Sequence, residues 1–130
     1  MKIVGACEYA VVLYRNKLPK FNNNGKMQFN WMTWESDTRS PKLHPTQKPV
    51  KLLEKLIELF TDDGDVIIDP CAGSGSSLIA ARNLRRKSYG FEIEKEFYKK
   101  AYAWINGTET QEEEEERKTN GIMNIFDYLD

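Results

Sequence analysis

The stretch that decides the fold runs Asp65-Val66-Ile67-Ile68-Asp69-Pro70-Cys71-Ala72-Gly73-Ser74-Gly75. It begins with a short continuous apolar run, which is typical of a parallel strand buried on both faces. It ends in a glycine loop, and residues 76–84 after the loop have the spacing of a helix. A second strand is expected at residues 88–93, followed by an amphipathic helix around Phe97, Ala101 and Trp104. This order predicts an α/β fold with a mostly parallel sheet, in which Ile67 and Phe91 lie in adjacent strands.

The sequence upstream of this unit predicts one more helix and one more strand. Residues 44–49, the lead-in segment, read His44-Pro45-Thr46-Gln47-Lys48-Pro49, and a proline suits the first helical turn. Apolar side chains then follow at helical spacing on one face: Val50, Leu53, Leu56, Ile57 and Phe60. Residues 9–14 are rich in β-branched and aromatic side chains and predict a buried strand. Residues 16–41 between them form a long irregular segment with several aromatic side chains.

Composition limits the classes of function. The 130 residues suffice for one folded domain, and no apolar run approaches the length of a membrane-spanning helix. The N-terminus lacks the layout of a signal peptide, so we expect a cytoplasmic protein without membrane contact. Cys7, Cys71 and the single histidine, His44, are too few for a disulfide framework or a zinc site, and no metal is expected. We expect His44 to form hydrogen bonds in its loop rather than to act as a base.

Charge divides the chain into two parts. Residues 1–105 carry 17 Lys and Arg against 12 Asp and Glu, whereas residues 106–130 carry 2 against 8. The basic part is compatible with binding nucleic acid, and a solvated surface explains the same surplus. We expect residues 1–105 to form the folded domain and residues 106–130 to be an acidic linker with a short apolar tail.

The glycine loop predicts a pocket for a nucleotide-like ligand. Gly73 and Gly75 allow the backbone to approach a ligand, and Glu92 follows the second strand, where a carboxylate can accept hydrogen bonds from ribose hydroxyls. Leu78 stands where a dinucleotide fingerprint has its third glycine, and no Gly-Lys-Ser/Thr follows, which excludes an NTPase phosphate loop. Among the common adenosine ligands, S-adenosylmethionine remains, and Asp69 would face its ammonium group. The alternative is that Asp69 caps a strand end and Glu92 is an exposed carboxylate.

Three blocks in this order resemble the β-class amino-methyltransferases of DNA, which act on N6 of adenine or N4 of cytosine. They are His44–Val50, Asp69–Ser77 and Tyr89–Ile93, and they are similar to motifs X, I and II of that family. Residues 8–14 are similar to the strand that precedes motif X. The resemblance spans residues 5–105. It implies a Rossmann-like methyltransferase fold with an incomplete, mostly parallel sheet flanked by helices. Residues 1–105 would form part of this methyltransferase domain.

The resemblance also implies S-adenosylmethionine as the cofactor, together with a set of residues that bind it. These residues are Thr46, Lys48, Asp69, Pro70, Gly73, Gly75, Ser76 and Glu92. Thr46 and Lys48 would hold the methionine end of the cofactor, and Glu92 would bind the ribose hydroxyls. Cys71 departs from the phenylalanine that is usual in the family, and Ser76-Ser77 replace two threonines. Both changes are small enough to keep the loop.

One departure from the family is large. Members hold the flipped target base with an Asp, Asn or Ser followed by Pro-Pro and an aromatic residue. The five prolines of this chain are never adjacent: Pro19, Pro41, Pro45, Pro49 and Pro70. In the β-class order this motif lies upstream of the three blocks. The chain is therefore expected to be the cofactor-binding C-terminal half of such an enzyme. It would contain no catalytic residue and would be inactive alone. We expect the complete enzyme to target adenine N6 rather than cytosine N4.

The partners that this interpretation implies are double-stranded DNA, bound through the complete enzyme, and an N-terminal complementing segment or subunit. A second copy of the chain is a further partner to consider. Three other functions stay open: a non-catalytic module for an adenosine ligand, a subunit of a split enzyme, and a methyltransferase that acts on RNA or protein.

Overall fold

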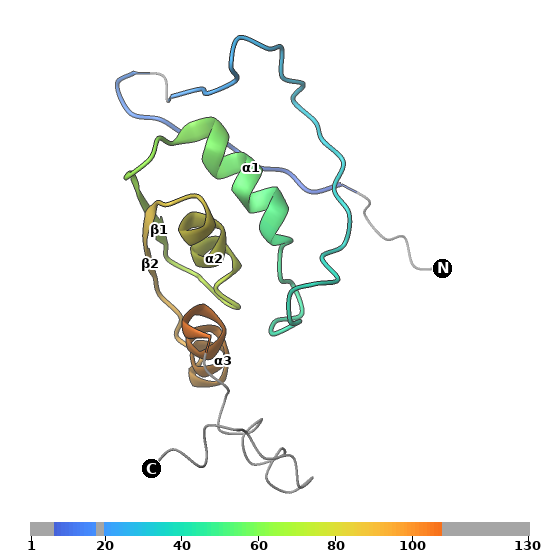
Figure 1. Cartoon of the computed structure of the whole chain (residues 1–130), viewed down its shortest axis with the longest axis vertical. Coiled ribbons are helices and arrows are strands. Elements are labelled where there is room, and N and C mark those ends of the chain that lie inside the picture. Colours follow the sequence, from blue (N-terminus) through green and yellow to red (C-terminus); the bar gives the residue numbers. More distant parts are fainter. Residues whose placement is uncertain (1–6, 18–19, 108–130) are drawn as a thin grey trace, which may run out of the picture.

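The computed structural model describes residues 7–17 and 20–107 of the chain (Figure 1). Three helices and two strands alternate along it: α1 (Val50–Phe60), β1 (Val66–Asp69), α2 (Ser76–Asn83), β2 (Lys87–Gly90) and α3 (Lys95–Asn106). The expected order of strand, loop, helix, strand and helix is confirmed. None of the helices in these residues is both long enough and apolar enough to span a membrane.

The two strands pair in parallel, which confirms the predicted α/β class. Val66 lies opposite Lys87, and Asp69 lies opposite Gly90. Phe91 and Ile93 were expected inside the second strand, and this expectation is wrong because β2 ends at Gly90. The Phe91 N–H donates to the Asp69 carbonyl at 2.9 Å, but β1 ends at Asp69 and the chain turns away at Pro70. The residues that follow β2 therefore have no part of β1 beside them to pair with.

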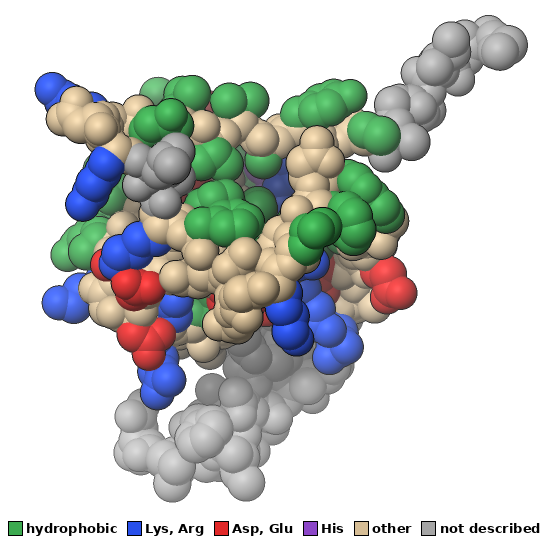
Figure 2. All heavy atoms as spheres, turned by 90° about the horizontal axis from the view of Figure 1, so that it is seen from above, with side chains coloured by type: hydrophobic (Ala, Val, Ile, Leu, Met, Phe, Trp, Pro, Cys, Tyr) green, Lys and Arg blue, Asp and Glu red, His purple; other side chains and the backbone are tan. Residues whose placement is uncertain are grey.

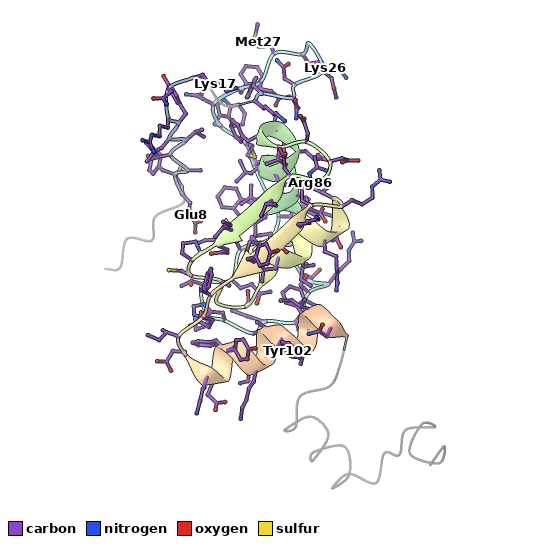
Figure 3. All side chains as sticks on the ribbon, turned by 90° about the vertical axis from the view of Figure 1, so that its left-hand side faces the viewer. Glu8, Lys17, Lys26, Met27, Arg86 and Tyr102 are labelled. Carbon is purple, nitrogen blue, oxygen red and sulfur yellow. The ribbon has the colours of Figure 1, made fainter. Side chains whose placement is uncertain are left out.

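The helices lie on one face of the sheet. α2 packs against both strands, and α1 and α3 pack against α2. Figure 3 shows the two strands in front of the helices, with no helix between the sheet and the viewer. The small core lies between the helices. Its members are Val50, Ile79 and Ala80, joined by the partly buried Leu53, Ile57, Trp104 and Ile105.

The opposite face of the sheet stays open in the described residues. Val66, Ile68 and Tyr89 are 51%, 65% and 60% exposed. The expectation that β1 is buried on both faces is therefore wrong. Alternate residues of a strand point to opposite faces, and only the face that carries Ile67 and Ser88 meets α2.

The strand predicted at residues 9–14 does not form either. Tyr9 and Leu13 are 93% and 86% exposed, and the segment runs without a strand partner. A strand is stable only when a neighbour takes up its backbone hydrogen bonds, and neither β1 nor β2 pairs with this segment. Figure 2 shows apolar side chains spread over the face to which the long N-terminal coil contributes.

The described residues of the irregular segment, 16–17 and 20–41, are coil as expected, and Asn22 is one residue that fastens the segment to the end of α1. The Asn22 backbone N–H donates to the Leu59 carbonyl at 2.7 Å, and the Asn22 side-chain amide donates to the Thr61 carbonyl at 2.9 Å. The chain thereby runs along α1 before it reaches the lead-in segment (Figure 1).

Arg86 ties together the two turns that flank the sheet. Its side chain is 9% exposed and donates to the Thr61 hydroxyl at 3.1 Å and to the Thr61 carbonyl at 3.0 Å. It also pairs with Asp63 at 2.7 Å. The turn after α1 and the turn after α2 are thus held by one guanidinium. The acidic linker and apolar tail expected beyond residue 106 lie outside the described residues, apart from Asn106 and Gly107.

Candidate cofactor site

The candidate site lies where β1 and β2 both end. Carboxyl ends of parallel strands meet at one edge of a sheet, and ligands of open α/β sheets bind outside that edge. Asp69 is the last residue of β1, and Glu92 follows the last residue of β2 by two positions. The glycine loop at residues 70–75 crosses this edge between β1 and α2. The residues that the sequence singled out from the two strands are therefore brought together.

Asp69 braces the glycine loop from its start. One carboxylate oxygen accepts a hydrogen bond from the Cys71 backbone N–H at 3.0 Å, and the other accepts one from the Ser77 hydroxyl. The bond to Ser77 ties the end of β1 to the first turn of α2. Asp69 thus caps the end of β1 and the start of the loop. Pro70, beside it, is exposed.

Glu92 braces the same loop from the side of the second strand. Its two oxygens accept hydrogen bonds from the Gly73 N–H and the Glu94 N–H, each at 2.8 Å. The Glu94 N–H, followed by the Gly73 N–H, holds the pKa of Glu92 below its ordinary value. The side chain is half-buried rather than fully exposed. A charged carboxylate accepts about four hydrogen bonds, so it keeps capacity for ligand hydroxyls.

The two glycines of the loop serve different purposes. Gly73 and Gly75 both have left-handed backbones, with φ of 53° and 79°. A Cβ on Gly75 would lie 2.9 Å from Ile105 Cδ1 and 3.3 Å from Ala101 Cβ, so the absent side chain lets α3 approach the start of α2. Around Gly73 there is more room. Its N–H is the group that reaches Glu92.

Ser76 begins α2 but faces inward. It is 6% exposed, and its hydroxyl lies 3.5 Å from that of the buried Ser74. No side chain caps the N-terminus of α2, where Gly75 is the residue before the helix. The part of Ser76 that could meet a ligand is therefore its backbone N–H rather than its hydroxyl.

The lead-in segment reaches the glycine loop through His44. A Cβ on Gly73 would lie 3.8 Å from the His44 ring, and Thr46 Oγ1 lies 3.0 Å from His44 Nδ1. Thr46 is therefore linked to the loop through His44. The Lys48 ammonium pairs with the Glu8 carboxylate at 2.9 Å. The expected hydrogen-bonding role of His44 is confirmed.

Sequence reasoning missed the part that Ser77 and Phe97 play around the loop. Ser77 donates to Asp69, and Phe97 packs against His44 with 4.3 Å between ring centroids. Ser77 had one available signal, since a hydroxyl in the first turn of a helix often faces the preceding loop. Phe97 had none, because its contact with His44 depends on how α3 packs.

One hollow in the described residues lies away from this edge. It is lined by the coil at residues 22–28 together with the end of α1 and Arg86. Its charges are mixed, with Lys55 and Asp62 on the same wall, and it contains neither Gly73 nor Glu92. We place the candidate site at the glycine loop, where backbone N–H groups and carboxylates converge.

Comparison with known proteins identifies the family. The family model for N6 and N4 methyltransferases, described as DNA methylase, matches residues 9–103. The chain belongs to this DNA methylase family. The match includes the lead-in segment, the glycine loop and Glu92, so all the residues proposed for the site lie inside the family's region.

Individual DNA methylases are similar over the same part of the chain. Type II methyltransferase M2.LlaDCHI of Lactococcus lactis subsp. cremoris is 38% identical over 96 residues, which cover 72% of this chain and 36% of that protein. Type II methyltransferase M2.DpnII of Streptococcus pneumoniae is 40% identical over 89 residues, covering 66% and 33%. The chain thus spans about a third of the length of these relatives.

A solved structure agrees with the fold. The crystal structure of the M1.HpyAVI-SAM complex superposes with a TM-score of 0.61 at 33% identity, covering 70% of this chain and 46% of that one. This confirms the expected methyltransferase fold, of which the described residues form a small part with two parallel strands and three helices.

Proposed function

We propose that this chain forms the S-adenosylmethionine-binding part of a DNA methyltransferase that modifies an exocyclic amino group, N6 of adenine or N4 of cytosine. The observation that carries the proposal is the arrangement of Glu92 and Gly73 at the common end of β1 and β2. Membership of the DNA methylase family and the cofactor in the M1.HpyAVI complex support it. Adenine N6 is the first target to test.

The residues present fit such a cofactor in chemical type. The Glu92 carboxylate, fixed by two backbone N–H groups, would bind the ribose hydroxyls. The hydroxyl and backbone groups of Thr46 and the N–H groups at the start of α2 would face the methionine end. Asp69 would keep the loop in shape through Cys71 and Ser77. The cofactor supplies an activated methyl group on a sulfonium, which an exocyclic amine can attack directly.

The part that holds the base would come from another segment or subunit. The sequence has no adjacent prolines, so it lacks the Pro-Pro-aromatic arrangement of the family. Orientation of the acceptor base beside the methyl group supplies much of the rate in a reaction of this type. The 130 residues alone are therefore expected to transfer no methyl group, and a complementing N-terminal part would be required for activity on double-stranded DNA.

Calorimetric titration with S-adenosylmethionine tests the binding proposal. Wild type should bind, and Glu92→Ala should bind at least about tenfold more weakly, because several hydrogen bonds to a charged group are lost. Glu35→Ala is the matched control, since it removes the same charge from an exposed coil position. Equal affinity of wild type and Glu92→Ala would contradict the role of Glu92 in the site.

A methyl-transfer assay tests the need for a complementing part. Radiolabelled S-adenosylmethionine is supplied with unmethylated DNA that contains both adenine and cytosine. The isolated 130 residues should leave the DNA unlabelled, and the modified base in any complemented reaction identifies the target. Turnover by the isolated chain would overturn the proposal that the base-holding part lies elsewhere.

A further inference from the structure

The single histidine of the chain lies where three segments meet. The His44 ring packs edge-on against Phe97 of α3, with 4.3 Å between centroids. A Cβ on Gly73 would lie 3.8 Å from the same ring. His44 Nδ1 lies 3.2 Å from the Thr46 backbone nitrogen and 3.0 Å from Thr46 Oγ1. One side chain therefore connects the lead-in segment to both the glycine loop and α3.

The hydrogen bond from the Thr46 backbone determines the tautomer of this ring. A backbone N–H can only donate, so His44 Nδ1 must accept and carries no proton. The proton of the neutral ring then lies on Nε2. The Thr46 hydroxyl also donates toward Nδ1, which leaves the lone pairs of Thr46 Oγ1 free to accept from a ligand. The orientation of this hydroxyl thus depends on an acceptor at residue 44.

We propose that His44 is a positioning residue of the cofactor site. Its Nδ1 atom orients Thr46, and its ring sets the lead-in segment against Gly73 and α3. The inference rests on the proposed function, in which Thr46 contacts the methionine end of the cofactor. Because Nδ1 accepts from Thr46, this atom orients Thr46 and does not take a proton from a substrate.

Two substitutions separate orientation by Nδ1 from packing by the ring. His44→Asn places a carbonyl oxygen near the position of Nδ1, and an asparagine readily accepts from the N–H two residues ahead. His44→Phe keeps an aromatic ring against Phe97 but offers no acceptor. We expect His44→Asn to bind S-adenosylmethionine nearly as tightly as wild type, and His44→Phe to bind about three- to tenfold more weakly, the loss that follows one hydrogen bond.

The opposite order of affinities would overturn the proposal. If the ring only packs, His44→Phe binds like wild type and His44→Asn is the weaker variant. Thermal unfolding shows whether each variant is folded before binding is compared. Thr46→Val provides a second measurement at an exposed position. This substitution should weaken binding of S-adenosylmethionine by itself. In the His44→Phe background it should cause little further loss of affinity. Wild-type affinity in Thr46→Val would contradict the proposal as well.

A spectroscopic measurement separates this inference from the proposed function. With one histidine in the chain, the ring ¹⁵N shifts of the uniformly labelled, unliganded protein belong to His44 alone. At a pH where the ring is neutral, we expect the Nε2–H tautomer in wild type, because Nδ1 accepts from the Thr46 N–H. A ring proton on Nδ1 in wild type overturns the inference. Absence of cofactor binding by wild type with the Nε2–H tautomer present contradicts the proposed function instead.

Discussion

Two carboxylates and one hydroxyl hold the shape of the glycine loop at the scale of single residues. Asp69 accepts from Cys71 and Ser77 at one end of the loop, and Glu92 accepts from Gly73 at the other. Each bond satisfies a polar group that the tight turn would otherwise leave unpaired. All of these bonds are made within the chain, which reduces the ordering that ligand binding would require.

Removal of the Ser77 hydroxyl should loosen the loop. Ser77→Ala deprives Asp69 of one donor, and we expect a loss of about 1 kcal/mol in the free energy of unfolding, typical of one hydrogen bond. Urea denaturation measures this change. Ser77→Thr keeps the hydroxyl and is the control. A stability of Ser77→Ala equal to that of Ser77→Thr would show that the bond to Asp69 contributes nothing.

The free energy of unfolding should depend on pH through Glu92, and the sign of this dependence follows from the lowered pKa of Glu92. Because the pKa is lower in the folded chain than its ordinary value of 4.5, the charged form favours folding. The stabilisation relative to Glu92→Gln should be complete above about pH 4.5 and disappear as the pH falls through the folded-state pKa. Urea denaturation of both proteins at several pH values measures it. A stability difference that grows toward acid pH would contradict this sign.

The sequence predicts those parts of the site that follow from the order of the elements. The position of Glu92 after the second strand is one of them, whereas its hydrogen bond to the Gly73 N–H was not foreseen. The bond between Asp69 and Ser77 and the contact between His44 and Phe97 depend on packing angles. The pairing of Lys48 with Glu8 joins residues 40 positions apart, and no local pattern predicts it.

At the scale of elements, α3 packs closely against the start of α2, beside the glycine loop. The sequence predicted all three helices and β1 from their apolar patterns, whereas the second strand was placed too late, at residues 88–93 instead of Lys87–Gly90. The strand at residues 9–14 was predicted wrongly, since a pattern shows that a segment can pair but not whether a neighbour is present. Close approach of α3 depends on Gly75.

Two glycine substitutions test how closely α3 approaches the start of α2. Gly75→Ala introduces a Cβ 2.9 Å from Ile105 Cδ1 at a left-handed φ of 79°, whereas Gly64→Ala meets nothing within 4 Å at a φ of 81°. The strain of a left-handed backbone is common to both and costs about 1 kcal/mol. Gly75→Ala should lose a further 1–3 kcal/mol, roughly, through overpacking. Thermal unfolding compares them, and equal losses would refute close packing at Gly75.

At the scale of the whole molecule, the sheet formed by the described residues has one face covered by helices and one open face. The open face carries Val66, Ile68 and Tyr89, and the exposed Phe91 follows β2 directly. Contiguous apolar surface of this kind marks a place where another part of a protein packs. The relatives are about three times as long as the matched region, which agrees with further structure on this face in them.

The open face should cause self-association of the chain. Ile68→Lys adds a charge to the open face, and we expect it to shift the chain toward monomer in light scattering without a change in circular dichroism. Ile67→Lys is the matched comparison, because the neighbouring side chain points toward α2 and its charge should unfold the protein. If Ile68→Lys associates as strongly as wild type, this face is not the one through which copies meet.

The central claim is that Glu92 binds the ribose of S-adenosylmethionine, and one pair of ligands tests it most directly. Calorimetry compares S-adenosylhomocysteine with its 2′-deoxyribose analogue on wild type and on Glu92→Ala. Wild type should prefer the ribose form by about tenfold or more, because a hydrogen bond to a charged acceptor is lost in the analogue. Glu92→Ala should bind both forms with nearly equal affinity. The same preference in both proteins would contradict the account.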